Sequence, residues 1–191
     1  MEAIRSREAA RRHYRDPVPF LRRLRVIERR LRGEPVDDQV KSLRTNKLKE
    51  WREARFGALF CHGMSELMGR KVFFAKGEFE DADFVGKWFD DGVQHFAPVQ
   101  NKELVSEERN ARITLNMLMH GLSMYSGRKD LTVLIHLNRR THFEPESLVL
   151  PPQLPIAALW VLACTDPTHF EWAIWGNFLE QAEGSRFAYP A

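Results

Sequence analysis

The stretch DFVGKWFDDGVQHFAPVQNKEL, residues 83–104, has the pattern of a β-hairpin. Its two runs, 83–89 and 95–104, are rich in the aromatic and β-branched residues that strands favour. Between them stands Asp90-Asp91-Gly92, and Asp-Gly at such a place is a strong signal for a tight two-residue turn. We therefore expect an antiparallel pair of strands here.

The turn also predicts which residues face one another. If it is centred between Asp91 and Gly92, cross-strand partners have residue numbers that sum to 183. Asp83 then lies opposite Gln100, and strand alternation returns Lys102 to the face of Gln100. The hairpin thus predicts that a carboxylate, a carboxamide and an ammonium group converge on one patch.

These three groups suit metal-assisted chemistry on a phosphate. Carboxylate and amide oxygens are hard ligands of the kind that Mg²⁺ takes. A lysine beside the metal can position the attacking water and stabilise charge on the phosphate. The alternative is an exposed polar face on which Asp83 and Lys102 form a weak surface pair.

Other segments predict helices and strands on both sides of the hairpin. Apolar residues at helical spacing, ending at Gly69, predict a helix over residues 46–68. The further elements expected in chain order are a strand at 71–75, a helix from Ser106 to about Gly127, a buried strand at 131–137, a short helix at 156–163 and a strand at 170–175. This order favours an α/β fold with a mixed sheet flanked by helices.

The amino-terminal segment predicts a separate, basic helix. Pro17 and Pro19 exclude a continuous helix through that point, and Gly33-Glu34-Pro35 ends the helix that follows. Its apolar stripe consists of Leu21, Leu24, Ile27 and Leu31. We therefore divide the chain into a basic helical arm at 1–40 and a core domain at 41–191.

Charge is distributed unevenly along the chain. Residues 1–55 contain 17 Lys and Arg against 9 Asp and Glu, a net charge of +8, and the remainder has 12 against 17, a net charge of −5. A basic arm beside an acidic domain indicates a polyanionic partner, with DNA the most obvious one. The arginines expected to contact phosphates are Arg22, Arg23, Arg29, Arg30, Arg139 and Arg140. The alternative is that all of them are simply solvated.

Asp83-Phe84-Val85 followed by Pro98-Val99-Gln100-Asn101-Lys102-Glu103 resembles the signature of the PD-(D/E)xK nuclease superfamily, in a variant with QxK. The resemblance covers roughly residues 46–138 and extends to the order of helix, three-stranded meander, helix and strand. It implies a restriction-endonuclease-like core and an endonuclease that hydrolyses phosphodiester bonds of DNA with Mg²⁺ or Mn²⁺.

The resemblance also implies a role for each matching residue. Asp83 would be the metal-binding aspartate, Gln100 the second ligand, and the Asn101 backbone carbonyl a further one, while Lys102 would be the catalytic lysine. Gln100 stands where an acidic residue is commoner, so the site has one negative charge fewer and should hold Mg²⁺ more weakly.

A glutamate from the preceding helix often joins such sites, and Glu53, Glu66 and Glu78 are the candidates. We favour Glu53, because it shares a helix face with Gly57, whose small size permits close approach. For each of the three, an exposed carboxylate is the alternative.

Several classes of protein are disfavoured. Two cysteines form no disulfide framework, which favours a reducing, cytoplasmic setting. No apolar run approaches the roughly 20 residues of a membrane span, residues 1–15 lack a signal-peptide stretch, and no phosphate-binding loop is found.

Three functions therefore remain open. The first is a Mg²⁺-dependent DNA endonuclease. The second is a catalytically inactive protein of nuclease fold that binds nucleic acid. The third is a protein-interaction module, in which the stripe of Leu24, Ile27 and Leu31 packs on a partner or on the second subunit of a homodimer.

Overall fold

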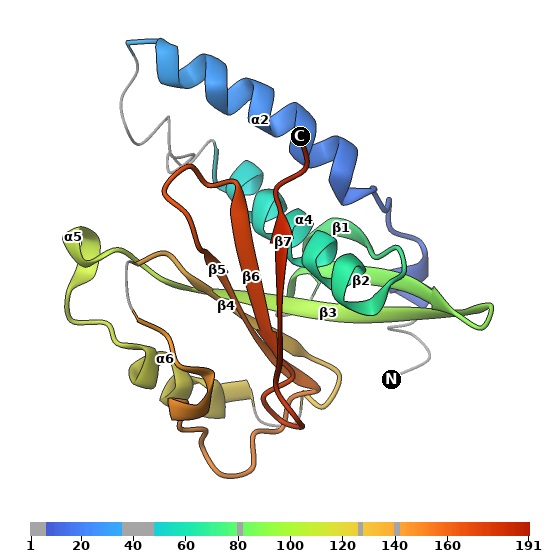
Figure 1. Ribbon diagram of the computed structural model, residues 1–191. Helices are drawn as coiled ribbons and strands as arrows, with labels where there is room; N and C mark the ends of the chain where they lie inside the picture. Colours follow the sequence, from blue (N-terminus) through green and yellow to red (C-terminus); the bar gives the residue numbers. More distant parts are fainter. Residues whose placement is uncertain (1–6, 36–47, 80–81, 126–127, 140–141) are drawn as a thin grey trace. The chain divides into compact units, whose positions relative to one another are not determined.

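The computed structural model describes residues 7–35, 48–79, 82–125, 128–139 and 142–191 (Figure 1). It is a mixed α/β structure with a seven-stranded sheet, hydrogen-bonded in the order β1-β2-β3-β4-β5-β6-β7, and the predicted mixed sheet is confirmed. The chain divides into two compact units, residues 1–97 with 189–191, and residues 98–188. Within the described ranges, no helix has both the length and the apolar character needed to cross a bilayer.

In the first unit, the predicted basic helix is α2 (Pro17–Gly33). Asp16 caps it, because its side chain accepts a hydrogen bond from the Val18 amide at 2.9 Å, and proline is well tolerated in a first turn. Leu21 and Leu24 are fully buried against the rest of this unit. Ile27, also part of the predicted apolar stripe, is 41% exposed.

A buried ionic cluster joins α2 to the next helix, α4 (Lys49–Met68), on which α2 packs. The Glu28 carboxylate of α2 is 6% exposed and lies 3.3 Å from a guanidinium nitrogen of Arg55 on α4. Arg25 approaches the same carboxylate to 3.7 Å and stacks on the ring of Tyr189. Because a buried carboxylate needs a cationic partner, this cluster fixes which side of α2 faces inward.

Helix α4 ends where the sequence predicts. Gly69 adopts the left-handed conformation with φ of 63°, and its amide donates to the Ser65 carbonyl. Further back, Gly57 lies directly on the ring of Phe84, since a Cβ added at Gly57 would be 3.0 Å from the Phe84 Cγ. The glycine therefore lets α4 approach the sheet closely.

The strands of the meander are β1 (Phe73–Phe79), β2 (Ala82–Asp90) and β3 (Val93–Leu104). Strands β1 and β2 are antiparallel, with Phe73 opposite Lys87 and Lys76 opposite Phe84. Asp91 and Gly92 form the turn to β3 with φ of 47° and 78°, so the predicted two-residue turn is confirmed.

The second unit is built around β4 (Thr132–Leu137), in which every residue is buried as predicted. It pairs in parallel with β3 on one side and with β5 (Ala158–Cys164) on the other. Strands β6 (Glu171–Gly176) and β7 (Glu183–Ala188) follow antiparallel, and the predicted strand at 170–175 corresponds to β6.

The helix predicted at 156–163 is wrong, because most of that segment is β5. Leu159, Val161 and Leu162 are fully buried, and the strand forms its backbone hydrogen bonds with the neighbouring strands β4 and β6. A short apolar run fits a buried strand as well as a helix, and pairing with β4 decides between them. Strand β7 was not predicted.

The single helix predicted from Ser106 to about Gly127 is also wrong. Its place is taken by α5 (Glu107–Asn110), α6 (Leu115–Gly121) and the 3-10 helix η2 (Leu122–Tyr125), while a second 3-10 helix, η3 (Pro145–Ser147), precedes β5. The break has a local cause, because Thr114 caps α6 by accepting from the Met117 amide at 3.2 Å.

Asp166 organises the turn between β5 and β6. Its carboxylate accepts from the amides of Thr168, Phe170 and Glu171 at 3.0, 2.8 and 2.7 Å, and from the Thr168 hydroxyl. The hydroxyl first, and then the backbone donors, lower the pKa of Asp166 from 3.8 to about 2. The turn therefore depends on an ionised carboxylate.

We expect Gly57→Val to lower the free energy of unfolding by about 1–3 kcal/mol, because the added methyl groups would overlap the Phe84 ring. Urea denaturation measures the change. Gly121→Val is the matched control: Gly121 is also helical, and a Cβ there would meet nothing within 4 Å. Equal tolerance of valine at the two positions would show that α4 does not lie on Phe84.

We expect Asp166→Asn to remove stability that the wild-type chain has near neutral pH. A carboxyl whose pKa is lower in the folded state stabilises the fold above its unfolded pKa near 3.8, and this contribution is lost as the pH falls toward 2. Denaturation midpoints should therefore differ at pH 7 and converge between about pH 4 and pH 2. Glu180→Gln, an exposed change of the same type in this unit, should show no such convergence.

Candidate active site

Asp83 is the second residue of β2, in the first unit, and is half-buried. Its neighbour Phe84 packs on Gly57 of α4. Because successive side chains of a strand point to opposite faces, Asp83 lies on the face turned away from α4. On that same face, two positions along, Val85 is fully buried, and Lys87 places its ammonium 4.3 Å from the ring centre of Tyr14.

Gln100 and Lys102 lie on β3 in the second unit, both half-buried. Gln100 is paired with Val133 of β4 and Lys102 with Ile135, so the parallel ladder to a buried strand fixes their backbone. The Gln100 side-chain nitrogen donates to the Asn101 carbonyl at 3.4 Å. In this orientation the amide oxygen, the atom that can bind a cation, is turned away from that carbonyl.

Tyr125 of η2 lies next to the Lys102 ammonium. The Lys102 Nζ is 5.3 Å from the centre of the Tyr125 ring, within the range of a cation–π interaction. Tyr125 is 7% exposed, and no described carboxylate of the second unit forms an ion pair with Lys102. The Lys102 ammonium thus lies beside a buried ring and forms no ion pair with a described carboxylate of its own unit.

The register of the hairpin can be followed within the first unit. Trp88 and His95 stack with ring centres 5.3 Å apart, and a Cβ at Gly86 would be 3.8 Å from the Ala97 carbonyl. Both pairs have residue numbers that sum to 183, as the turn predicts. Asp83 and Gln100 belong to different units, so their convergence stays a prediction from this register.

The helix glutamates are placed as follows. Glu53 of α4 is half-buried and lies one turn before Gly57, on the side of the helix that contacts Phe84. Asp83 lies on the face of β2 that is turned away from α4. The Glu53 carboxylate could therefore approach Asp83 only around the amino-terminal end of β2. Glu66 is 58% exposed and lies 3.9 Å from the His62 ring, and the Glu78 side chain is outside the described residues.

The donor atoms fit a hard divalent cation. Asp83 offers a carboxylate and Gln100 an amide oxygen, and both residue types bind Mg²⁺ in proteins. Three or more His, Cys, Asp or Glu side chains in a metal-binding group are not found among the described residues. Among the predicted ligands Asp83 has the only carboxylate, and the Asn101 carbonyl oxygen, which has two lone pairs, could bind a cation while it accepts from the Gln100 amide.

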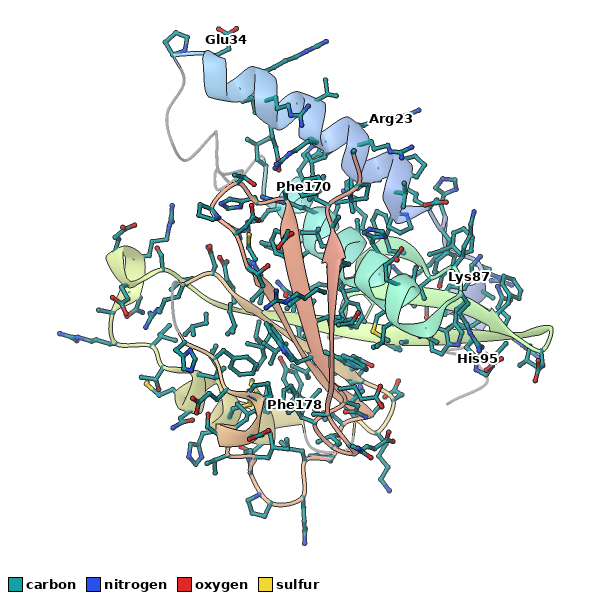
Figure 2. The ribbon with its side chains drawn as sticks, viewed as in Figure 1. Arg23, Glu34, Lys87, His95, Phe170 and Phe178 are labelled. Carbon is teal, nitrogen blue, oxygen red and sulfur yellow. The ribbon has the colours of Figure 1, made fainter. Side chains whose placement is uncertain are left out.

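The predicted phosphate-binding arginines divide into two kinds. Arg22, Arg23, Arg29 and Arg30 of α2 are all exposed, and Figure 2 shows Arg23 on the outer side of the helix. Arg139 is 11% exposed and is occupied within the second unit, donating to the carbonyls of Val105 at 3.1 Å and Asn110 at 2.8 Å, with Glu107 3.9 Å away. These contacts give Arg139 a structural role. Arg140 lies outside the described residues.

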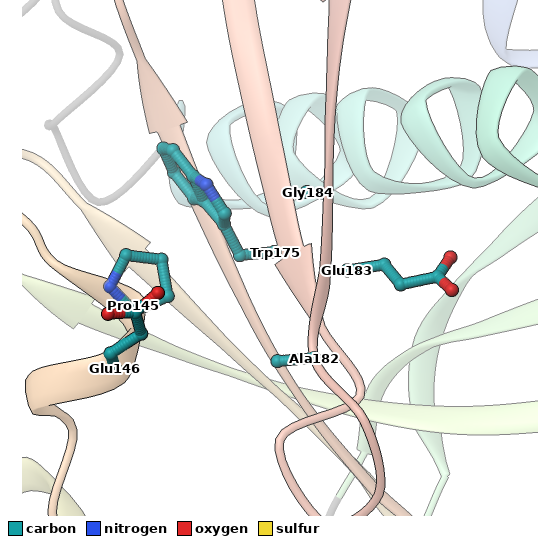
Figure 3. A pocket seen from close by; sticks show the side chains of 6 residues that line it. All are labelled: Pro145, Glu146, Trp175, Ala182, Glu183 and Gly184. Carbon is teal, nitrogen blue, oxygen red and sulfur yellow. The ribbon is translucent and has the colours of Figure 1, made fainter.

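Two further described features, a buried cysteine and a cavity, contribute no competing chemistry. Burial raises the pKa of the Cys61 thiol well above its usual range, so this cysteine is a poor nucleophile. A cavity of about 360 Å³ in the second unit, lined by Pro145, Glu146, Trp175, Ala182, Glu183 and Gly184, contains none of the predicted site residues (Figure 3).

The contact of Tyr125 with Lys102 was missed from the sequence. Helical spacing does not predict that the end of the expected helix, which forms η2, contacts β3. An aromatic residue at such a position is ordinarily interpreted as part of the hydrophobic core. No family model matches the chain, and neither a curated protein nor a solved structure matches it.

We expect the Tyr125 ring to be detectable at Lys102 by NMR. After reductive methylation with ¹³C-formaldehyde, the dimethyl-Lys102 signal should be displaced upfield by the ring and be absent in Lys102→Arg. Tyr125→Phe should keep the displacement, whereas Tyr125→Leu should move the signal to the position of an exposed lysine such as Lys71, which is 79% exposed. An unchanged signal in Tyr125→Leu would contradict the contact.

Proposed function

We propose that this protein is a Mg²⁺- or Mn²⁺-dependent endonuclease that hydrolyses phosphodiester bonds of DNA. The observation that carries the proposal is the hairpin register. Trp88 stacks on His95, and the same pairing continued along the strands would bring Asp83 opposite Gln100. The resemblance of these residues to the PD-(D/E)xK signature supports the same reading.

Each residue has a distinct role in the proposed site. Asp83 and the Gln100 side-chain oxygen would hold the cation, which when bound polarises the phosphate and offsets the charge that develops on it. Lys102 Nζ would donate hydrogen bonds to the phosphate and to the attacking water, aligning the water with the phosphorus atom. Tyr125, through its ring contact with Lys102, would limit the movement of that ammonium.

The neutral Gln100 favours a second candidate, a catalytically inactive protein of the same fold that binds nucleic acid or a protein partner. One carboxylate fewer weakens the attraction for a divalent cation. The two candidates differ in a single measurable property, because both would bind DNA but only the first would cleave it in the presence of a metal.

We expect the purified full chain to cleave plasmid DNA with Mg²⁺ or Mn²⁺, and Asp83→Asn or Lys102→Ala to reduce the rate by about 10²-fold or more. Gln100→Glu should reach half-maximal rate at a lower Mg²⁺ concentration, because it adds a charged ligand. Agarose-gel assays over a metal titration measure these rates.

Two matched controls separate the site from general effects on the fold. Asp91→Asn changes an exposed turn aspartate to a residue that tolerates its positive φ, and Lys129→Ala removes an exposed lysine. Both should retain wild-type rates. Cleavage that survives Asp83→Asn or Lys102→Ala would exclude the proposed site, and cleavage absent from the wild type but present in Gln100→Glu would favour the second candidate.

A further inference from the structure

Helix α2 has two faces of opposite character. Its inner face is fixed by buried Leu21 and Leu24, by Glu28 with its arginine partners, and by the Tyr189 hydroxyl, which donates to the Leu21 carbonyl at 3.0 Å. The outer face carries four arginines and two exposed aliphatic side chains: Arg22, Arg23, Val26, Ile27, Arg29 and Arg30. The contacts of the inner face hold this outer face in a fixed orientation on the first unit.

The four arginines form two parallel rows. At ~100° per residue, Arg22 and Arg29 lie within about 20° of each other around the helix axis, and so do Arg23 and Arg30. The rows are about 100° apart, and within each row the two Cα atoms are separated by about 10.5 Å along the axis. Val26, which is 48% exposed, lies between the rows.

The charges of these rows are available to a ligand. All four arginines are exposed, and none forms an ion pair with a described residue of the first unit. Arg25 differs from them, because it points inward to Glu28 and to the Tyr189 ring. The outer face therefore presents two rows of positive charge with an apolar residue between them, and no described carboxylate of the first unit pairs with either row.

We propose that the outer face of α2 binds double-stranded DNA in the major groove, each arginine row contacting the phosphates of one strand and Val26 facing the base edges. The major groove of B-form DNA admits an α-helix and is bordered by phosphates on both sides, which matches two rows. This inference rests on the proposed function for its choice of DNA as ligand, and it names the duplex as the substrate class.

Other polyanions fit this surface less well. A single strand has one line of phosphates and would engage one row, with no reason for the second. The A-form RNA major groove is too deep and narrow for a helix. An anionic membrane would require a broad apolar face, whereas the outer face of α2 exposes only Val26 and Ile27 among six residues.

Binding without a divalent metal tests the inference independently of cleavage. Fluorescence anisotropy in EDTA, over a range of salt concentrations, compares the full chain on a 20-base-pair DNA duplex, its single strand, the same duplex in RNA, and phosphatidylserine vesicles. Four phosphate contacts predict a slope of log K against log salt of roughly −3.6 on the duplex. Arg22→Ala/Arg29→Ala and Arg23→Ala/Arg30→Ala should each reduce it to about −1.8.

The matched control is Arg109→Ala/Arg112→Ala, which removes two exposed arginines of the second unit and should leave the slope unchanged. Circular dichroism checks that the α2 variants remain folded, as expected for exposed arginines replaced by a strong helix former. The inference would be overturned if only one of the two α2 double variants had a reduced slope, or if the single strand bound with the same affinity as the duplex. Binding to vesicles but not to DNA would also overturn it. Duplex binding with the predicted slopes but no cleavage under any metal would leave it standing and remove the proposed function.

Discussion

The turn at Asp91 and Gly92, two consecutive residues with positive φ, fixes the register of the hairpin. The packing of the first unit depends on this register. A tight turn of this kind fixes the register, and a shift by one residue would exchange the two faces of β2. In the register observed, Phe84 lies against Gly57 of α4, and Lys87 lies beside the Tyr14 ring on the opposite face. The chemistry that we assign to Asp83 depends on the same alternation.

Burial and charge are combined differently around Lys102 and on α2. On β3, the parallel ladder to the buried strand β4 fixes the Lys102 backbone, and the ring of Tyr125 lies next to the Lys102 ammonium. On α2, the inner carboxylate of Glu28 takes up the inward-pointing arginines, and the outer arginines stay in solvent. Lys102 and the outer arginines of α2 form no ion pair with a described carboxylate of their own unit, and such cations suit the recognition of phosphate.

The hairpin turn and several of the elements that carry the candidate residues could be predicted from the sequence, because local rules act there. The turn follows from Asp-Gly, the beginning of α2 from Asp16 and two prolines, the end of α4 from Gly69, and β4 from its apolar run. Each of these signals is a property of a few adjacent residues: a positive φ, a missing amide hydrogen, a capping oxygen or continuous hydrophobicity. The amide orientation of Gln100 had no such signal.

The sequence by itself therefore determined the hairpin, the boundaries of the long helices and the residues that could carry chemistry. The tertiary structure alone decided that 158–164 is a strand, because pairing with β4 outweighs a helical pattern too short to be decisive. It also decided that Ile27 is exposed, since the buried pair of Glu28 and Arg55 sets the rotation of α2. Contacts such as Tyr125 with Lys102 join residues 23 positions apart, and no local rule encodes which face of a helix will meet which strand.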